Sequence, residues 1–247
     1  MKKLFYHRCT AFLILTLALQ GCSKGKDPGS GSGPDNPSGS TSSAKLEVSM
    51  SGAINHTTYT LGQTASVSFN RFPKTVAEFK EVREKIGGEP HGAVALQIMA
   101  YEMYRRDRTI GEECVKLNNL TNNVTLPLSR LRELFGTDVN YARPYQMAAM
   151  LKGATPENGY NPTKPYTIEV RVSAGNPYQY SSIYQTNVLY LQLLTQGRDN
   201  GVVGVDVLNT LDPNQPSGGK YFIVFACSSV YSQVKAISFS ATFKGLD

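Results

Sequence analysis

Histidine and cysteine, which most often supply nucleophiles, bases and metal ligands, are scarce in this sequence. The chain has three His and four Cys among 247 residues. Neither His56 nor His91 has a second His or a Cys at the short spacing that zinc sites use, and no acidic loop matches a calcium-binding pattern. His91 follows Pro90 at an expected helix start, which favours a surface or capping role. We therefore expect no metal and no cofactor.

The thiols and hydroxyls form no recognisable nucleophilic site. Cys114 and Cys227 each lie among apolar residues at core spacing, which favours two buried free thiols. A disulfide between them stays open if the compartment is oxidising, and a catalytic pair with His56 or His91 is the third alternative. No Gly-x-Ser-x-Gly motif lies between a strand and a helix. These observations lead us to expect that the protein is not an enzyme.

Carboxylates are few, and one pair is relevant to glycan chemistry. Glu169 and Asp206 fall in alternating segments and could both lie on exposed strand faces. Hydrolysis of a glycosidic bond needs two carboxyl groups that face each other across a defined gap. Sequence does not give that gap, so a glycan or cell-wall hydrolase is kept only as the weakest functional hypothesis.

A tyrosine-rich stretch at residues 176–187 is the strongest candidate for ligand binding. Tyr178, Tyr180 and Tyr184 stand there among amides and hydroxyls, in an expected loop or edge strand. Flat rings with a polar end can stack on sugars or pack against a protein partner. The alternative is a structural loop that covers the edge of a sheet.

The elements that must position these residues follow an N-terminal targeting segment. MKKLFYHR is a positively charged start and TAFLILTLAL is an apolar run, a pattern typical of a secretory signal and too short to span a bilayer. The segment ends Leu19-Gln20-Gly21-Cys22, which resembles the lipobox of bacterial lipoproteins. That resemblance implies cleavage after residues 1–21 and acylation of Cys22 as a membrane anchor. The alternative is an ordinary secreted protein with a chance Cys22.

Residues 22–44 are predicted to be a disordered tether. Gly, Ser and Pro dominate them and no large apolar residue is present, so they cannot bury enough surface to fold. By resemblance to bacterial sorting rules, Ser23 directly after Cys22 favours the outer membrane. The acidic run that directs some lipoproteins to the cell surface is weak or absent in residues 23–27, so the choice between the periplasmic face and the cell surface stays open.

The positive charge of the chain does not indicate a nucleic-acid partner. The formal charge is +6, but Lys2, Lys3 and Arg8 belong to the signal segment, and their removal leaves +3. A short basic cluster at residues 105–108 sits where a helix should end, and cations there favour the helix dipole. The alternative for this cluster is a site for an anion or a lipid headgroup. We therefore expect no nucleic-acid binding.

Residues 45–72 should begin the folded domain as β structure. Residues 46–50 alternate between polar and apolar, and the alternation returns after a turn at Gly62-Gln63. We expect a lead-in strand and then a hairpin whose first strand contains Tyr59 and Leu61.

Residues 73–153 change to the period of helices. Thr75 and Glu78 have the spacing of a capping box, and Gly87 supplies a stop. Residues 93–106 are apolar almost all round, which is typical of a helix at the centre of a core.

Shorter helices are expected in the rest of this region. Thr109 and Glu112 have the spacing of a second capping box, and Pro127 suits a first helical position. Residues 144–151 repeat the helical pattern more briefly before Gly153. Four or five short helices should therefore pack as a cluster.

Helix breakers occupy residues 154–165, and a two-residue period returns over residues 166–247. The run 221–227 is the most apolar and is expected at the centre of the sheet. The order indicates an α+β fold, with an N-terminal β-hairpin, the helical cluster and a C-terminal antiparallel sheet of about five strands. Strands are expected at residues 166–172, 188–194, 201–208, 221–227 and 234–243, in a single domain over residues 45–247.

Several segments together resemble a family of envelope lipoprotein domains from Bacteroidetes and related gut bacteria that carries no assigned function. They are TVAEFKEVREKIGG, HGAVALQIMAYEMYRRD, NGYNPTKPYTIEVRV and KYFIVFACSSVYSQVKAI. The resemblance covers roughly residues 73–243. It implies an α+β domain in a bacterial envelope and transfers no catalytic residue.

From these observations we expect an outer-membrane lipoprotein that acts as a non-enzymatic interaction module. Its partners would be the membrane, through the lipid on Cys22, and an envelope protein or polymer. A carbohydrate-binding accessory lipoprotein is the second hypothesis, because the tyrosine-rich stretch could also stack on sugars.

Overall fold

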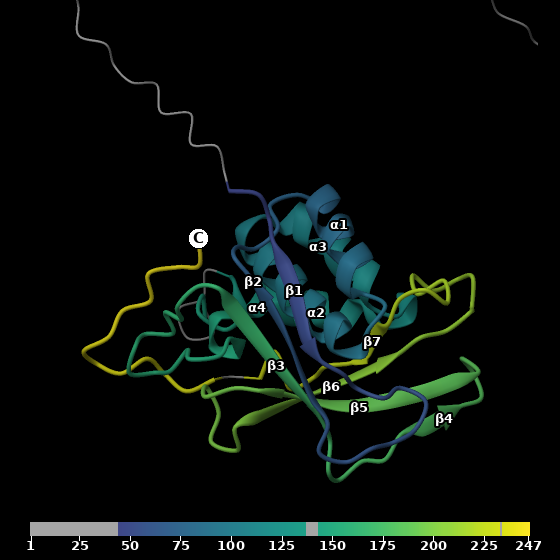
Figure 1. Cartoon of the computed structure of the whole chain (residues 1–247). Helices are drawn as coiled ribbons and strands as arrows, with labels where there is room; N and C mark the ends of the chain where they lie inside the picture. The colour runs from purple at the N-terminus through teal and green to yellow at the C-terminus, as the bar shows by residue number, and fades with distance from the viewer. Residues whose placement is uncertain (1–43, 137–142, 233) are drawn as a thin grey trace, which may run out of the picture. The chain divides into compact units, whose positions relative to one another are not determined.

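The computed structural model describes residues 44–136, 143–232 and 234–247, which form four α-helices and seven strands in an α+β fold (Figure 1). Residues 44–247 make one compact unit. The expected signal peptide, Cys22 and the tether up to residue 43 lie outside the described residues. In chain order the elements are β1 (Val48–Gly52), β2 (Thr64–Phe69), α1 (Val76–Ile86), α2 (Pro90–Arg106), α3 (Arg108–Asn118), α4 (Thr125–Leu134), β3 (Tyr166–Val172), β4 (Gln179–Ser181), β5 (Thr186–Leu194), β6 (Val202–Leu208) and β7 (Ile223–Ala226).

The N-terminal hairpin and the C-terminal strands belong to one antiparallel sheet. Its order is β1-β2-β3-β5-β6-β7, and the short β4 pairs with the first part of β5. β2 pairs with β3 along its whole length, from Thr64 opposite Arg171 to Phe69 opposite Tyr166. Strands distant in sequence therefore share a sheet, with the helices packed on one face of it (Figure 1).

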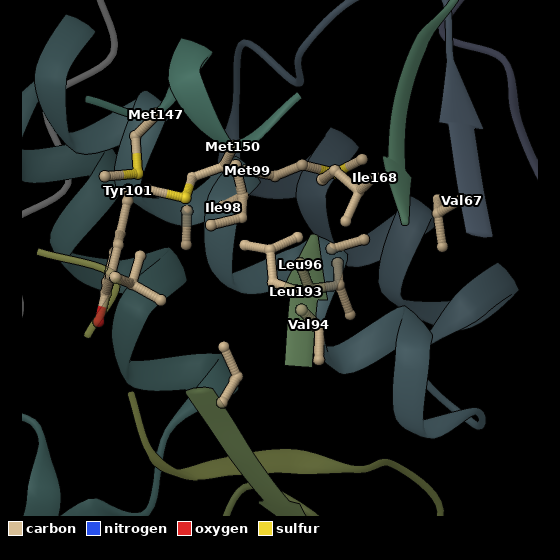
Figure 2. Packing of buried hydrophobic residues seen from close by; sticks show 14 of the residues in the cluster. Val67, Val94, Leu96, Ile98, Met99, Tyr101, Met147, Met150, Ile168 and Leu193 are labelled. Carbon is tan, nitrogen blue, oxygen red and sulfur yellow. The ribbon is translucent and has the colours of Figure 1, made fainter. Parts of the chain in front are cut away.

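The core lies between this sheet and α2. Every residue of α2 from Pro90 to Tyr104 is buried, which confirms the predicted central helix. Figure 2 shows Leu96, Ile98 and Met99 of α2 gathered with Ile168 and Leu193 of the sheet. Because α1 and α3 cover the other side of α2, this helix meets no water along most of its length.

The local helix signals are partly confirmed at α1. The Thr75 hydroxyl accepts a hydrogen bond from the Glu78 N–H at 3.1 Å, and Gly87 follows the last helical residue. The second half of the capping box does not form. The Glu78 carboxylate instead accepts from the Lys74 N–H at 2.8 Å and pairs with Arg71.

Other helix boundaries differ from the sequence prediction. Asp107 caps α3, because its carboxylate accepts from the Ile110 N–H at 3.0 Å, so the predicted cap at Thr109 is wrong. Pro127 is the third residue of α4, not the first. The helix expected over residues 144–151 is only one 3-10 turn, Ala148–Met150, and the N–H groups of Met150 and Leu151 donate to the carbonyls three residues back.

The expected hairpin strand at Tyr59 and Leu61 is wrong. β1 pairs directly with β2, and residues 53–63 form the loop between them. The Tyr59 hydroxyl donates to the Ser173 carbonyl at 2.8 Å, so this residue ties the loop to the end of β3 and does not extend a strand.

The strand expected at the centre of the sheet is β7, at its edge. It is shorter than predicted, and the segment after α3 covers its outer side. The Leu120 N–H donates to the Val224 carbonyl at 3.1 Å, and the Asn123 amide donates to the Phe225 carbonyl at 2.7 Å. This cover explains why an edge strand carries such an apolar sequence.

Residues 234–243 form no strand, although their alternation predicts one. The Lys235 N–H bonds the Gly197 carbonyl, and the Ser238 N–H bonds the Pro156 carbonyl. The segment therefore crosses two loops, while Ile237 and Phe243 pack against the core.

Candidate functional site

The structure does not join the three candidate tyrosines into one platform. The Tyr178 hydroxyl donates to the Asn55 carbonyl at 2.7 Å, so this ring serves to hold the loop after β1. Tyr180 lies on β4 and is 66% exposed. The Tyr184 ring meets Phe225 edge-on at 6.3 Å between ring centroids.

Of these three, Tyr184 alone lines a groove of about 630 Å³, which we call the three-loop groove. Its walls come from residues 183–186 after β4, residues 209–212 before β7, and His56 in the loop after β1. Gly219, Leu189 and Phe222 complete the lining. The groove thus collects residues from three separate parts of the chain.

Two aliphatic side chains in the groove lining are left open to water. Ile183 is 81% exposed and Leu211 is 85% exposed. Scattered exposed apolar residues are ordinary, but two that line the same groove beside aromatic rings make a local apolar patch. Such a patch is typical of a binding surface.

Hydrogen bonds hold two of the groove walls together. The Thr210 hydroxyl donates to the Tyr184 carbonyl at 2.9 Å, which joins the loop before β7 to the turn after β4. The Gly219 N–H donates to the Thr210 carbonyl at 2.8 Å, and the Asn209 amide donates to the Gly219 carbonyl at 3.1 Å. The loop is therefore closed on itself at its base.

The back of this loop is also anchored. The Arg83 guanidinium in α1 donates to the Pro216 carbonyl at 2.6 Å and lies 4.0 Å from the centre of the Tyr221 ring. The Gln215 side-chain oxygen accepts from the Thr121 N–H at 2.9 Å. A groove bounded by loops held in this way is preformed, as ligand sites usually are.

The third wall is fixed in a similar manner. The Asn55 N–H donates to the Gln63 side-chain oxygen at 2.7 Å, and the Asn55 carbonyl accepts from Tyr178. The neighbouring His56 ring meets Phe222 edge-on, with centroids 5.4 Å apart. His56 is thereby held at the groove, although its position in the sequence gave no sign of this.

The groove offers apolar surface, ring faces and a few polar groups. Asp212 is engaged in its own turn, because its Oδ1 accepts from the Asn214 N–H at 2.9 Å. Gln185 adopts a left-handed backbone conformation with φ of 51°, which turns the chain at the groove wall. Within the described residues, no three His, Cys, Asp or Glu side chains gather closely enough to hold a metal ion. This chemistry suits binding by contact and hydrogen bonding.

Cys114 and Cys227 are free thiols, and both are buried. Burial raises the pKa of Cys114 and of Cys227 to about 12, so both stay protonated at neutral pH. The Cys227 sulfur lies 3.0 Å from the Tyr101 hydroxyl inside the core. Since the thiolate is the reactive form, neither residue is placed to act as a nucleophile.

Glu169 and Asp206 are too far apart to act as a glycosidase pair. Asp206 lies opposite Tyr190 on β5, whereas Glu169 falls at the level of Leu194. The two residues are four positions apart along the strand direction, which is about 13 Å. They are also two strand spacings apart across the sheet, which is about 10 Å. Glycosidases place their carboxyl groups about 5–9.5 Å apart. Glu169 instead pairs with Lys152 at 2.8 Å.

His91 is buried, so the predicted surface or capping role is wrong. The residue is 1% exposed, and neither ring nitrogen has a hydrogen-bond partner among the described residues. Loss of water lowers the pKa of its imidazole. The reason is that α2 begins at Pro90, earlier than predicted, which carries His91 into the core with the rest of the helix.

Most of the groove residues carry no functional signal in the sequence. Ile183, Leu211, His56 and Phe222 come together only through loops that the sequence shows as separate turns. Leu211 is a large apolar residue in a segment otherwise rich in Asn, Asp, Pro and Gly. A single exposed apolar residue is ordinary, so Leu211 alone does not predict a binding surface.

Comparison with known proteins supplies a family but no activity. Residues 71–238, about two thirds of the chain, match the family model described as a domain of unknown function (DUF6935). No curated protein and no solved structure matches the chain. In the described part of the chain, no helix is long and apolar enough to cross a membrane.

Proposed function

The chain belongs to the family of the domain of unknown function DUF6935. From its N-terminal segment and its groove we propose that it is a membrane-anchored envelope lipoprotein acting as a non-enzymatic interaction module. The lipid on Cys22 anchors it to the outer membrane, and the three-loop groove receives its partner. The observation that carries the binding role is the exposed pair Ile183 and Leu211 in a preformed groove.

A protein partner suits this groove best. Ile183 and Leu211 would each lose most of their exposed apolar surface on contact, and burial of apolar surface gains about 25 cal/mol per Å². The rings of Tyr184 and His56 lie beside them in the groove lining. Tyrosine is among the residues that carry most of the binding energy in protein interfaces.

The position of the groove supports a tethered role. The Arg71 Nε–H donates to the Ala44 carbonyl at 2.6 Å, which fixes the point where the tether would enter the domain. In Figure 1 the segment that leads into β1 lies near the top of the domain, whereas β4 and the loop that leads into β7 lie on the right. The attachment point of the tether and the groove thus belong to different parts of the domain.

A carbohydrate is the second candidate ligand. The observation in its favour is that Tyr184 lies in the groove with the polar side chains of Gln185, Thr186 and Asp212. A ring face with neighbouring hydrogen-bonding groups can bind a sugar.

Cysteine footprinting in the intact envelope tests whether the groove is occupied. We expect Leu211→Cys in the full chain to react slowly with a membrane-permeant maleimide in whole envelopes and quickly after purification. Phe239→Cys, at a fully exposed position outside the groove, is the control and should react at the same rate in both.

Equal labelling of Leu211→Cys in envelopes and after purification would contradict an occupied groove. Protection of the purified protein by added oligosaccharides would identify the second candidate ligand. Protection only in the envelope, insensitive to oligosaccharides, would favour the protein partner.

A further inference from the structure

We propose that the free edge of β1 is a self-association surface, through which two copies of the chain pair their β1 strands antiparallel about a two-fold axis at Met50. The pairing would join two sheets into one continuous sheet. This surface is distinct from the three-loop groove and adds an oligomeric state to the proposed binding function.

The β1 edge is open, whereas the opposite edge of the sheet is covered. β1 stands first in the strand order and pairs only with β2 among the described residues. Val48 is half-buried, and Ser49 to Gly52 are exposed. At the other edge, the Leu120 N–H occupies the Val224 carbonyl of β7. The protein has therefore closed one edge and left the other unpaired.

The open edge lacks the features that usually prevent strand addition. Natural edge strands are protected by charged residues, proline or bulges. β1 reads Val-Ser-Met-Ser-Gly, without charge or proline, and its pairing with β2 runs in unbroken register from Val48 to Gly52. An edge of this kind is ready to accept another strand.

The sequence of β1 is complementary to itself. With the axis at Met50, each Met50 faces the Met50 of the partner copy, and each Ser49 faces a Ser51. Glu47, the nearest charged residue, would lie opposite Ala53, so no like charges meet. Direct cross-strand neighbours of this kind are the stabilising units of sheets.

Met50 gives the pairing an apolar contact. It lies opposite the fully buried Val67 of β2, on the face of the sheet that carries the core. It is nevertheless 38% exposed, because β1 lies at the border of that core. Two Met50 side chains placed side by side would cover each other and extend the core across the axis.

A second copy is the occupant that the chain itself supplies. β1 begins four residues after Ala44, where the expected tether ends. Under the proposed lipid anchor, all copies share one membrane surface, and tethering raises the effective concentration of their β1 edges toward one another. The same confinement supplies no comparable advantage to a soluble partner.

Disulfide trapping in the full chain tests this geometry. Directly opposed residues have Cβ atoms about 4.5–5.5 Å apart, close to the separation in a disulfide. Met50→Cys should therefore give a cross-linked dimer on mild oxidation in membranes. Ser51→Cys, whose partner is Ser49, and Leu61→Cys, exposed but outside the strand, should give little. All three variants carry the same native cysteines, of which Cys114 and Cys227 are buried.

A charge exchange provides an independent test in purified, detergent-solubilised protein. Met50→Lys alone and Met50→Glu alone place like charges opposite each other and should each weaken self-association about tenfold, measured by sedimentation. A mixture of the two variants should restore dimers. Equal cross-linking of Met50→Cys and Leu61→Cys, or failure of the mixture to restore dimers, would overturn the proposal. Cross-linking of Met50→Cys only to a different protein would also overturn it.

Discussion

At the scale of single residues, two titratable groups, the half-buried Asp206 and the buried His91, respond to pH in opposite directions. Asp206 lies on β6, where loss of water raises the pKa of its carboxyl group from 3.8 to about 6. Burial lowers the pKa of His91. The carboxyl is tolerated best when protonated and the imidazole when neutral, so each group limits the stability of the fold at one end of the pH range.

Asp206→Asn should stabilise the protein at pH 7.5 and have a much smaller effect near pH 4. The folded-state pKa of Asp206 is raised, so its contribution to stability is fully present below the unfolded pKa of 3.8 and is lost as pH rises through about 6. Asparagine removes this ionisation. Urea unfolding of both proteins at the two pH values measures the difference, and His91 cancels because both contain it.

An equal change in the free energy of unfolding at pH 4 and at pH 7.5 would contradict this account. It would mean that the substitution alters packing beside Tyr190 and Ala226, the residues opposite Asp206, and not the ionisation of the carboxyl group.

At the scale of elements, the turn between β4 and β5 stores strain at the groove. Gln185 adopts φ of 51°, which costs a residue with a side chain about 1–2 kcal/mol. Gln185→Gly should therefore raise the free energy of unfolding by up to about 1 kcal/mol, which corresponds to about 2–4 °C in Tm for a domain of this size. Calorimetry of the variant measures the shift.

Gly62→Ala, in the loop between β1 and β2, is the reverse control, because it adds a side chain at a left-handed position instead of removing one. Gly62 has φ of 84° and open space around its Cα, so an added methyl group meets backbone strain and no clash. The alanine variant should lose about 1 kcal/mol. A fall in Tm for Gln185→Gly would show that the Gln185 side chain makes contacts that outweigh the strain.

The helices and inner strands could be predicted from sequence because short-range patterns determine them. The structure contains three features that these patterns predict: the buried helix α2, the Thr75 N-cap of α1 and the strand β3. The prediction of a strand over residues 234–243 is wrong. The apolar residues of this alternating segment, Ile237 and Phe243, pack against the core without a neighbouring strand. Strand pairing is a long-range property, and period alone does not reveal which edge is available.

At the scale of the whole molecule, one sheet unites distant parts of the chain and leaves two surfaces for contact. Pairing of β2 with β3 brings the N-terminal hairpin beside the C-terminal strands. The three-loop groove and the β1 edge then lie on different parts of that sheet. The groove could not be predicted from sequence, because Ile183 and Leu211 are brought together only by the folded loops.

The measurement that tests the binding role most directly is photo-cross-linking from the groove in living cells. A photoreactive amino acid at position 211 of the full chain should yield one discrete adduct, and the same amino acid at position 239 should yield none. Replacement of Ile183 by Ser in the position 211 variant should reduce the adduct severalfold without changing Tm, since Ile183 is exposed. Equal adducts from positions 211 and 239, or an adduct unaffected by the loss of Ile183, would contradict the groove as the binding site.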